Sequence, residues 1–222
     1  NAFSANNMIQ TNISFTDAGI QKYFPAISST ETFTYPIGAA GKYTPVELSI
    51  DQKDAGGSVR VKAANEMHPN IIEDEESPDP EIVDADNVLQ YHWVVDAENI
   101  LNFKGNIYMR YSDEDTFYTD PYDITDYITA RLLSDSTNWN KYDNTSFDQS
   151  NNQLNFDIGD PEAVDDGGVT GDYTAGVDGL NFNGAIPDSV PIYHSADDGD
   201  WFTNSTWQEN IPGGPRGAIA VV

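Results

Sequence analysis

Cysteine is absent from the 222-residue chain, and basic residues are scarce. Without cysteine there is no disulfide framework, no thiolate metal site and no cysteine nucleophile. Only 10 Lys and Arg residues stand against 37 Asp and Glu residues, which gives a formal net charge of −27. We expect no nucleic-acid partner, because a phosphate backbone needs a basic surface that this chain lacks.

Long apolar runs and helical patterns are also missing. No stretch approaches the roughly 18 apolar residues that a membrane-spanning helix needs, so we expect no membrane insertion. Aromatic residues make up 12% of the chain, however, which supplies large apolar groups for a core. The sequence therefore predicts a folded protein with a strongly acidic surface, suited to a salty, calcium-containing extracellular or cell-surface location.

Short strand patterns rich in Tyr, Val, Ile and Thr recur between Gly, Pro, Asp and Asn residues. They lie at 33–38, 43–50, 57–64, 89–95, 105–112 and 126–133. Several alternate with period two: Ile107, Met109 and Tyr111 fall on one face of their strand. This pattern predicts an all-β protein with antiparallel strands in a sandwich, and the glycines of "DAGGS" at 54–58 predict a hairpin.

Both ends of the chain differ from the middle. The first 29 residues hold a strand pattern around Met8 and Ile9 without a neighbouring hairpin partner, and the last residues read "AIAVV" after Trp201 and Trp207. We expect these strands to be unpaired within the domain. They would pair with flanking modules or with identical subunits by strand addition, and the chain would then be one link of a longer protein or a self-assembling subunit.

Several segments taken in order resemble a recurring array in large secreted surface proteins of Bacteroidota, many of them cargo of the type IX secretion system. The segments are "FTYPIGAAGKYTPVELSI" (33–50), "LQYHWVVDAENILNFKGNIYMRYSDED" (89–115), "GDYTAG" (171–176), "PIYHS" (191–195) and "GDWFTNSTWQENIP" (199–212). The resemblance implies an immunoglobulin-like β-sandwich, followed by the start of another module. It also implies an adhesive or spacer role rather than a catalytic one.

On this basis we expect three parts: residues 1–29 as the end of a preceding module or an exchanged strand, 30–195 as the sandwich, and 196–222 as the start of a following module or an exchanged strand. The acidic loop at 73–86 and the insertion "DTFYTDPYDITDY" depart from the family pattern. Any ligand shared with the family is therefore not carried over to this chain.

The loop at 111–127 gathers several carboxylates after a core strand. Calcium takes six to eight oxygen ligands and favours clustered Asp residues. The predicted calcium ligands are Asp113, Asp115, Asp120, Asp123 and Asp126. The loop lacks the EF-hand spacing, and a solvated acidic loop without a metal is the alternative. Two further acidic clusters, at 73–76 and 157–166, read more simply as solvated loops.

Trp139 and Tyr142 lie among Asn and Asp residues and are the predicted ligand residues of a carbohydrate-binding surface, although a partly buried tryptophan at a strand end is the simpler interpretation. Trp93, within "YHWVV", is expected in the core. The three histidines lack metal-binding spacing, so zinc is not expected. No G-x-S-x-G motif is present, and a pair of glycosidase carboxylates would be recognised only by its separation in space.

The leading hypothesis is therefore a non-enzymatic extracellular module that acts in adhesion or as a structural unit of a surface array or filament, stabilised by cations. A carbohydrate-binding module that uses loop aromatics, including those at 117–127, is the alternative. A hydrolase is a remote alternative.

Overall fold

The computed structural model describes residues 3–14, 16–26, 29–71, 84–133, 139–142, 145–159, 168–177 and 182, and the short strands at 192–194 and 219–221. The chain divides into two compact units, Asn1–Gly184 and Ala185–Val222. The protein is all-β, as the strand patterns predicted, with several open sheets. In the described residues the helices are short 3₁₀ turns, none long and apolar enough to cross a membrane.

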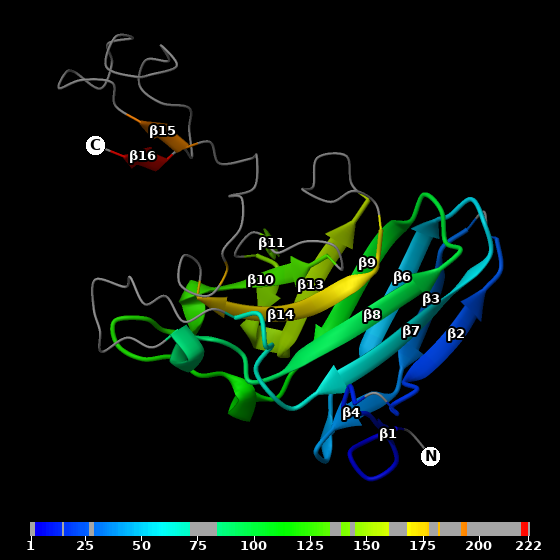
Figure 1. Ribbon diagram of the computed structural model, residues 1–222, viewed down its shortest axis with the longest axis horizontal. Coiled ribbons are helices and arrows are strands. Elements are labelled where there is room, and N and C mark those ends of the chain that lie inside the picture. The colour runs from blue at the N-terminus through cyan, green and yellow to red at the C-terminus, as the bar shows by residue number, and fades with distance from the viewer. Residues whose placement is uncertain are drawn as a thin grey trace. The chain divides into compact units, whose positions relative to one another are not determined.

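Two antiparallel sheets make up most of the first unit (Figure 1). The six-stranded sheet has the order β11 (Trp139–Lys141), β10 (Tyr127–Leu132), β14 (Gly171–Val177), β8 (His92–Glu98), β7 (Gly57–Ala64) and β2 (Ile20–Phe24). The five-stranded sheet has the order β12 (Phe147–Asp148), β13 (Gln153–Ile158), β9 (Lys104–Arg110), β6 (Val46–Gln52) and β3 (Glu31–Tyr35). Each of the six predicted strand segments overlaps at least one strand of the structure.

The main core lies between the two sheets, in a sandwich-like arrangement. Ile107 and Met109 of β9 are fully buried, and Tyr111, just after the strand, is nearly so, which confirms the predicted inward face. Trp93 of β8 is buried as predicted and donates from its indole N–H to the carbonyl of Thr44. The sheets are also joined by a hydrogen bond across the core, because the Tyr35 hydroxyl donates to the carbonyl of Val59.

A second apolar cluster covers the outer face of the six-stranded sheet at its β10–β11 edge. Its buried members are Ile71, Val88, Ile128, Ala130, Leu132, Trp139 and Phe182. Strand β10 is consequently buried along its whole length, on both faces. The buried strand is not wholly apolar, because it includes Thr129, whose hydroxyl shares a hydrogen bond with that of Ser146, and Arg131, which donates to the carbonyl of Thr170.

A small third sheet closes one end of the sandwich. It has the order β1 (Ile9–Gln10), β4 (Ile37–Ala39) and β5 (Lys42–Tyr43). Strands β4 and β5 form a tight hairpin through Ala40 and Gly41, whose φ angles are 52° and 83°. Two consecutive residues with positive φ are what a two-residue hairpin loop requires. This turn fixes the position of Lys42, the first residue of β5.

The N-terminal segment belongs to this sandwich, which corrects the expectation that its strands are unpaired. Strand β2 pairs with β7 over its full length, and β1 pairs in parallel with β4. Thr11 exchanges two hydrogen bonds with the backbone of Ala63. The Asp17 carboxylate accepts the backbone N–H groups of residues 12, 13 and 19. The partners of these strands lie far along the chain, so a search for neighbouring hairpins misses them.

A further expectation, the hairpin at 54–58, differs from the structure. The "DAGGS" segment does not form a hairpin, because β6 and β7 lie in different sheets and the connection crosses between them. Gly57 instead allows close packing, since a Cβ atom there would lie 2.2 Å from the carbonyl oxygen of Glu98. The two compact units divide at 184/185, and the domain boundary expected at 195/196 stays a prediction.

In the second unit the structure describes two strands, β15 (Ile192–His194) and β16 (Ile219–Val221), which pair in parallel. The "AIAVV" strand therefore has a partner within the chain, which again differs from the expectation of an unpaired terminal strand. Trp201 and Trp207 lie outside the described residues.

Candidate functional site

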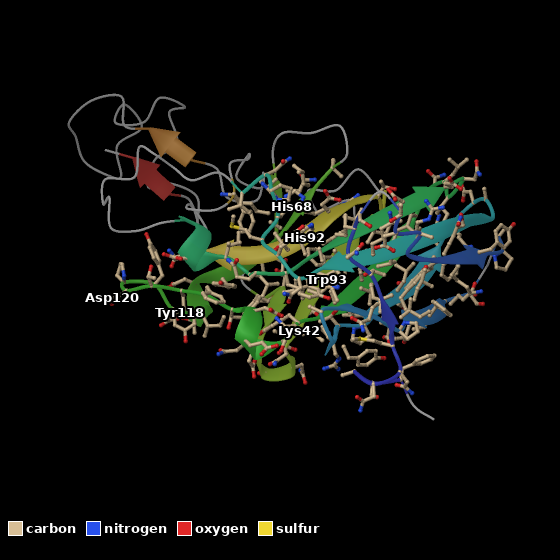
Figure 2. All side chains as sticks on the ribbon, turned by 60° about the horizontal axis from the view of Figure 1, so that its bottom comes forward. Lys42, His68, His92, Trp93, Tyr118 and Asp120 are labelled. Carbon is tan, nitrogen blue, oxygen red and sulfur yellow. The ribbon has the colours of Figure 1, made fainter. Side chains whose placement is uncertain are left out.

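The loop 111–126 connects β9 of the five-stranded sheet to β10 of the six-stranded sheet. We call it the β9–β10 loop. It contains two 3₁₀ turns, η2 (Asp113–Asp115) and η3 (Ile124–Asp126). Figure 2 shows Tyr118 and Asp120 projecting at one end of the sandwich, well away from the core tryptophan Trp93. The loop holds the predicted calcium ligands and several aromatic residues.

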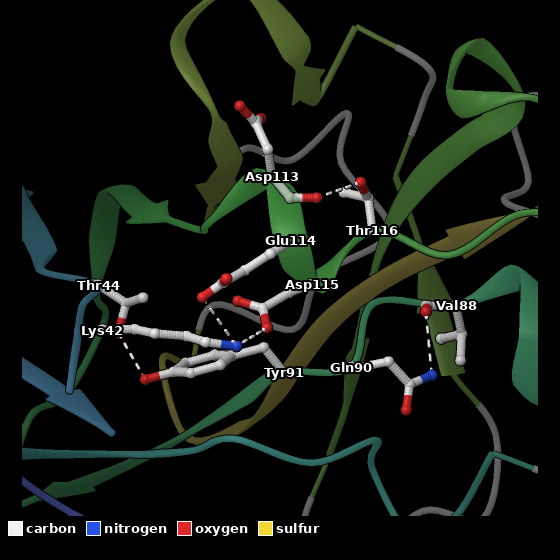
Figure 3. Close-up of polar contacts among 9 residues, drawn as sticks. All are labelled: Lys42, Thr44, Val88, Gln90, Tyr91, Asp113, Glu114, Asp115 and Thr116. Carbon is white, nitrogen blue, oxygen red and sulfur yellow. Dashed lines mark hydrogen bonds and ion pairs between the residues drawn. The ribbon is translucent and has the colours of Figure 1, made fainter. Parts of the chain in front are cut away.

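An ion pair with the β4–β5 hairpin fixes the first half of the loop. The Lys42 ammonium is in direct contact with Asp115 Oδ1 and lies 3.4 Å from Glu114 Oε1 (Figure 3). The carbonyl of Asp115 also accepts the backbone N–H of Gln90 at 2.8 Å. Both the side chain and the backbone of Asp115 are therefore held by distant parts of the chain.

Asp115 is almost completely buried, with 1% of its surface exposed. Burial raises the pKa of its carboxyl group, an effect that the hydrogen bond and charge of Lys42 oppose. Its second oxygen, Oδ2, is buried and has no hydrogen-bond partner among the described residues. Tyr91 is fully buried close by and shares a 2.6 Å hydrogen bond with the hydroxyl of Thr44 (Figure 3).

Backbone contacts fix the middle of the loop. The Tyr127 hydroxyl donates to the carbonyl of Phe117 and accepts the backbone N–H of the same residue. The Asn87 carboxamide oxygen accepts both the N–H and the hydroxyl of Thr119, at 2.9 and 3.3 Å. These partners come from β10 and from η1 (Asp84–Asn87), so the loop is held from two directions.

The second half of the loop is held by a capping box around η3. The Asp123 carboxylate accepts the N–H and the hydroxyl of Thr125, while the Asp126 carboxylate accepts the N–H of Asp123. The side-chain and backbone hydrogen bonds from Thr125 lower the pKa of Asp123. Both carboxylates thus serve as internal acceptors that stabilise the turn.

Two aromatic side chains project from this well-anchored loop. Phe117 and Tyr118 are each 48% exposed, although their backbone atoms lie between the anchors described above. An exposed aromatic ring on a rigid loop loses little conformational entropy when it binds a partner. The exposed rings are therefore a candidate contact surface, flanked by the exposed residues Asp113 and Asp120.

The five predicted calcium ligands are not brought together as one group. Asp115 contacts Lys42, Asp123 and Asp126 cap η3, and Asp113 accepts a hydrogen bond from Asn152 at 2.6 Å. Over the described ranges, no group of three or more Asp, Glu, His or Cys side chains is placed to hold a metal ion. Calcium binding by this loop stays a prediction. In the structure, the positive charge in contact with Asp115 is that of Lys42.

The predicted sugar-binding aromatics, Trp139 and Tyr142, are not placed on an open surface. Trp139 is 2% exposed and packs edge-on against His68 and Phe182. Tyr142 is half-buried and packs edge-on against Phe156. Since a sugar stacks on an accessible ring face, the buried Trp139 serves the core, which corresponds to the simpler interpretation of the sequence.

A second buried polar group lies beside Trp139. It consists of His68 and His92 with their hydrogen-bond partners, and we call it the histidine cluster. His68 Nε2 lies 2.9 Å from Asp172 Oδ2, and its Nδ1 accepts the backbone N–H of Asn70. The His92 ring packs edge-on against His68 and bonds through Nδ1 to the carbonyl of Glu66. Burial lowers the pKa of His92. Because both ring nitrogens of His68 already have protein partners, the cluster is built as a structural unit.

Comparisons with protein-family models, with curated proteins and with solved structures found no match. The geometry of the β9–β10 loop is therefore the feature from which a function can be inferred. Lys42 and Asn87 are the residues that sequence reasoning missed. Lys42 is separated from Asp115 by 73 positions, and its one visible signal is the two-residue turn pattern "AG" immediately before it.

Proposed function

We propose that this chain is a non-enzymatic module of an extracellular surface protein, which acts in adhesion through its β9–β10 loop. The observation that carries the proposal is the presence of two exposed aromatic rings, Phe117 and Tyr118, on a loop whose backbone is anchored by Tyr127 and Asn87. The sandwich is the immunoglobulin-like scaffold of this module, in line with the resemblance to surface proteins of Bacteroidota.

Loops at the end of a rigid β-scaffold are a common place for recognition. Here the anchoring contacts order the loop before any partner arrives, so binding does not have to supply the ordering free energy. Aromatic side chains at the centre of a contact contribute much of the binding energy of protein interfaces. The high negative charge keeps the acidic surface solvated around these rings and disfavours acidic partners.

A carbohydrate is the second candidate ligand class. Exposed rings offer apolar faces to sugar C–H groups, and neighbouring carboxylates such as Asp120 accept hydrogen bonds from sugar hydroxyls. A carbohydrate-binding module with this surface would use Phe117 and Tyr118 in place of Trp139 and Tyr142. A structural spacer, by contrast, would bind no glycan.

The experiment is a binding screen of the full chain against a glycan array and against surface proteins from the same source. The test variant is Phe117→Ala combined with Tyr118→Ala. The matched control is Tyr23→Ala, because Tyr23 is also a strongly exposed aromatic but lies on strand β2. The proposal expects binding that the double substitution abolishes and the control retains. Binding that survives the double substitution would contradict it.

A further inference from the structure

The contact between Lys42 and Asp115 combines a primary amine, a buried carboxyl group and a second carboxylate. Lys42 Nζ touches Asp115 Oδ1, and Glu114 Oε1 lies 3.4 Å from the same nitrogen (Figure 3). We propose that Lys42 and Asp115 join in an intramolecular amide bond, with Glu114 as the residue that relays the protons. The test of this covalent link does not depend on the adhesive role proposed above.

Strand pairing and backbone hydrogen bonds hold the two reacting residues in contact with each other. Lys42 follows the tight Ala40–Gly41 turn and pairs with Ala39 in the hairpin. Asp115 is fixed by two backbone hydrogen bonds, from its N–H to Ser112 and from Gln90 to its carbonyl. Two reactants kept in contact in this way react as in a unimolecular step, which greatly raises their effective concentration.

The reaction balances without any cofactor. One proton passes from the Lys42 ammonium through the carboxylate of Glu114 to the Asp115 carboxylate, and the neutral amine attacks Cγ of the protonated Asp115. The C–N bond forms, the nitrogen passes a second proton through Glu114 to the departing hydroxyl, and the C–O bond breaks with release of one water molecule. In sum, an ammonium and a carboxylate become an amide and one water molecule, with no change in oxidation state or net charge.

Burial favours this outcome in two ways. The pKa of Asp115 is raised by its removal from water, which favours the protonated acid that the amine attacks. The ion pair also leaves Oδ2 buried without a described hydrogen-bond partner, which is costly in a protein interior. Amide formation removes one of the two carboxyl oxygens and both charges of the ion pair, of which that of Asp115 is buried.

Among the described lysines, Lys22 and Lys53 are in different surroundings. Lys22 lies 3.9 Å from Glu31, and both side chains are about one-third exposed, so water solvates their charges. Lys53 is buried over the ring of Phe24, and its Nζ has no hydrogen-bond partner among the described residues. Lys22 is therefore the matched control for an ordinary ion pair.

The experiment measures the intact mass of the purified full chain under denaturing conditions. The wild-type protein should be lighter than its sequence by the mass of one water molecule. Lys42→Arg keeps the positive charge but cannot form the amide, and Asp115→Ala removes the carboxyl group; both should show the full sequence mass. Glu114→Gln should leave most of the protein at full mass, whereas Lys22→Arg should lose water as the wild type does.

A wild-type mass equal to the sequence mass would overturn the proposal. A loss of water that persists in Lys42→Arg would also overturn it, because the modification would then lie elsewhere. Where a variant fails to fold, fragmentation of the wild-type protein in the mass spectrometer locates the modified residues. Loss of water assigned to Lys42 and Asp115 supports the proposal. Loss of water assigned to any other pair contradicts it.

Discussion

The two buried polar groups of the sandwich, the Lys42–Asp115 pair and the histidine cluster, differ in how their atoms are satisfied. In the histidine cluster, His68 uses one ring nitrogen toward Asp172 and the other toward the backbone of Asn70. In the Lys42–Asp115 pair, one carboxyl oxygen is buried and has no partner in the described part of the chain. Complete pairing stabilises a fold, whereas an unsatisfied buried group needs an explanation in chemistry or function.

The difference extends to the surroundings of each group. In the histidine cluster, the His68 ring is in edge contact with His92 and with Trp139, which in turn packs edge-on against Phe182. The Lys42–Asp115 pair lies at the base of the β9–β10 loop. Asp115 precedes the exposed Phe117 by two residues. We interpret the first as a structural unit and the second as the anchor of the surface on which the proposed function depends.

Removing Trp139 should have the largest effect on stability. Trp139→Ala deletes a buried ring that packs against His68 and Phe182, and such truncations cost about 3–5 kcal/mol. The free energy of unfolding, measured by urea denaturation, should fall by this amount. Trp139→Phe, which keeps an apolar ring, should cost less. Full stability of Trp139→Ala would show that the residue is not part of the core.

Breaking the Lys42–Asp115 pair should have the next largest effect. Asp115→Ala leaves the Lys42 ammonium, which is 20% exposed, with the exposed Glu114 as its acidic neighbour, and removing the buried partner of such a pair costs about 3 kcal/mol. Urea denaturation of this variant, with Asp113→Ala as the exposed control, measures the difference. Equal stability of the two variants would contradict the assignment of Asp115 as the anchor of the loop.

The histidine cluster should make stability depend on acid pH. Burial lowers the pKa of His92, so the folded protein binds a proton less readily than the unfolded chain. The stabilisation is fully present above the ordinary histidine pKa of about 6.5 and is lost as the pH falls through the pKa of the folded state. The melting temperature should therefore fall between pH 7 and pH 5, and His92→Gln should reduce this slope. An unchanged slope would show that His92 does not cause it.

The exposed rings should matter least for stability. Phe117→Ala combined with Tyr118→Ala should change the free energy of unfolding by no more than about 0.5 kcal/mol, as expected for exposed positions. Chemical denaturation of this double variant beside the wild type measures the change. A larger loss would mean that the rings stabilise the loop rather than present a binding surface.

The strands were predictable from the sequence because their alternation records which face is buried. Ile107, Met109 and Tyr111 followed this rule, and Trp93 was correctly placed in the core. The pairing of strands was harder to predict. The glycines of "DAGGS" indicated a hairpin, but the same residues permit a crossing between sheets, because Gly57 packs against the backbone of Glu98.

The candidate site was predicted only in outline. The concentration of carboxylates identified the β9–β10 loop, but spacing along the chain does not show which of them meet in space. Asp115 meets Lys42 from a distant hairpin, while Asp123 and Asp126 are used by a local turn. For Trp139 the sequence left two interpretations open, a ligand residue or a partly buried residue at a strand end, because the residues that pack against it, His68 and Phe182, are far away in the sequence.

The most direct test of the contrast between the two polar groups is tryptic mapping of the denatured wild-type protein. With a free Lys42, trypsin cleaves after this residue and releases the linear peptides 23–42 and 111–131. We predict instead that cleavage after Lys42 is absent and that residues 23–53 appear joined to residues 111–131, with the loss of one water molecule. Recovery of the two separate linear peptides would contradict the account.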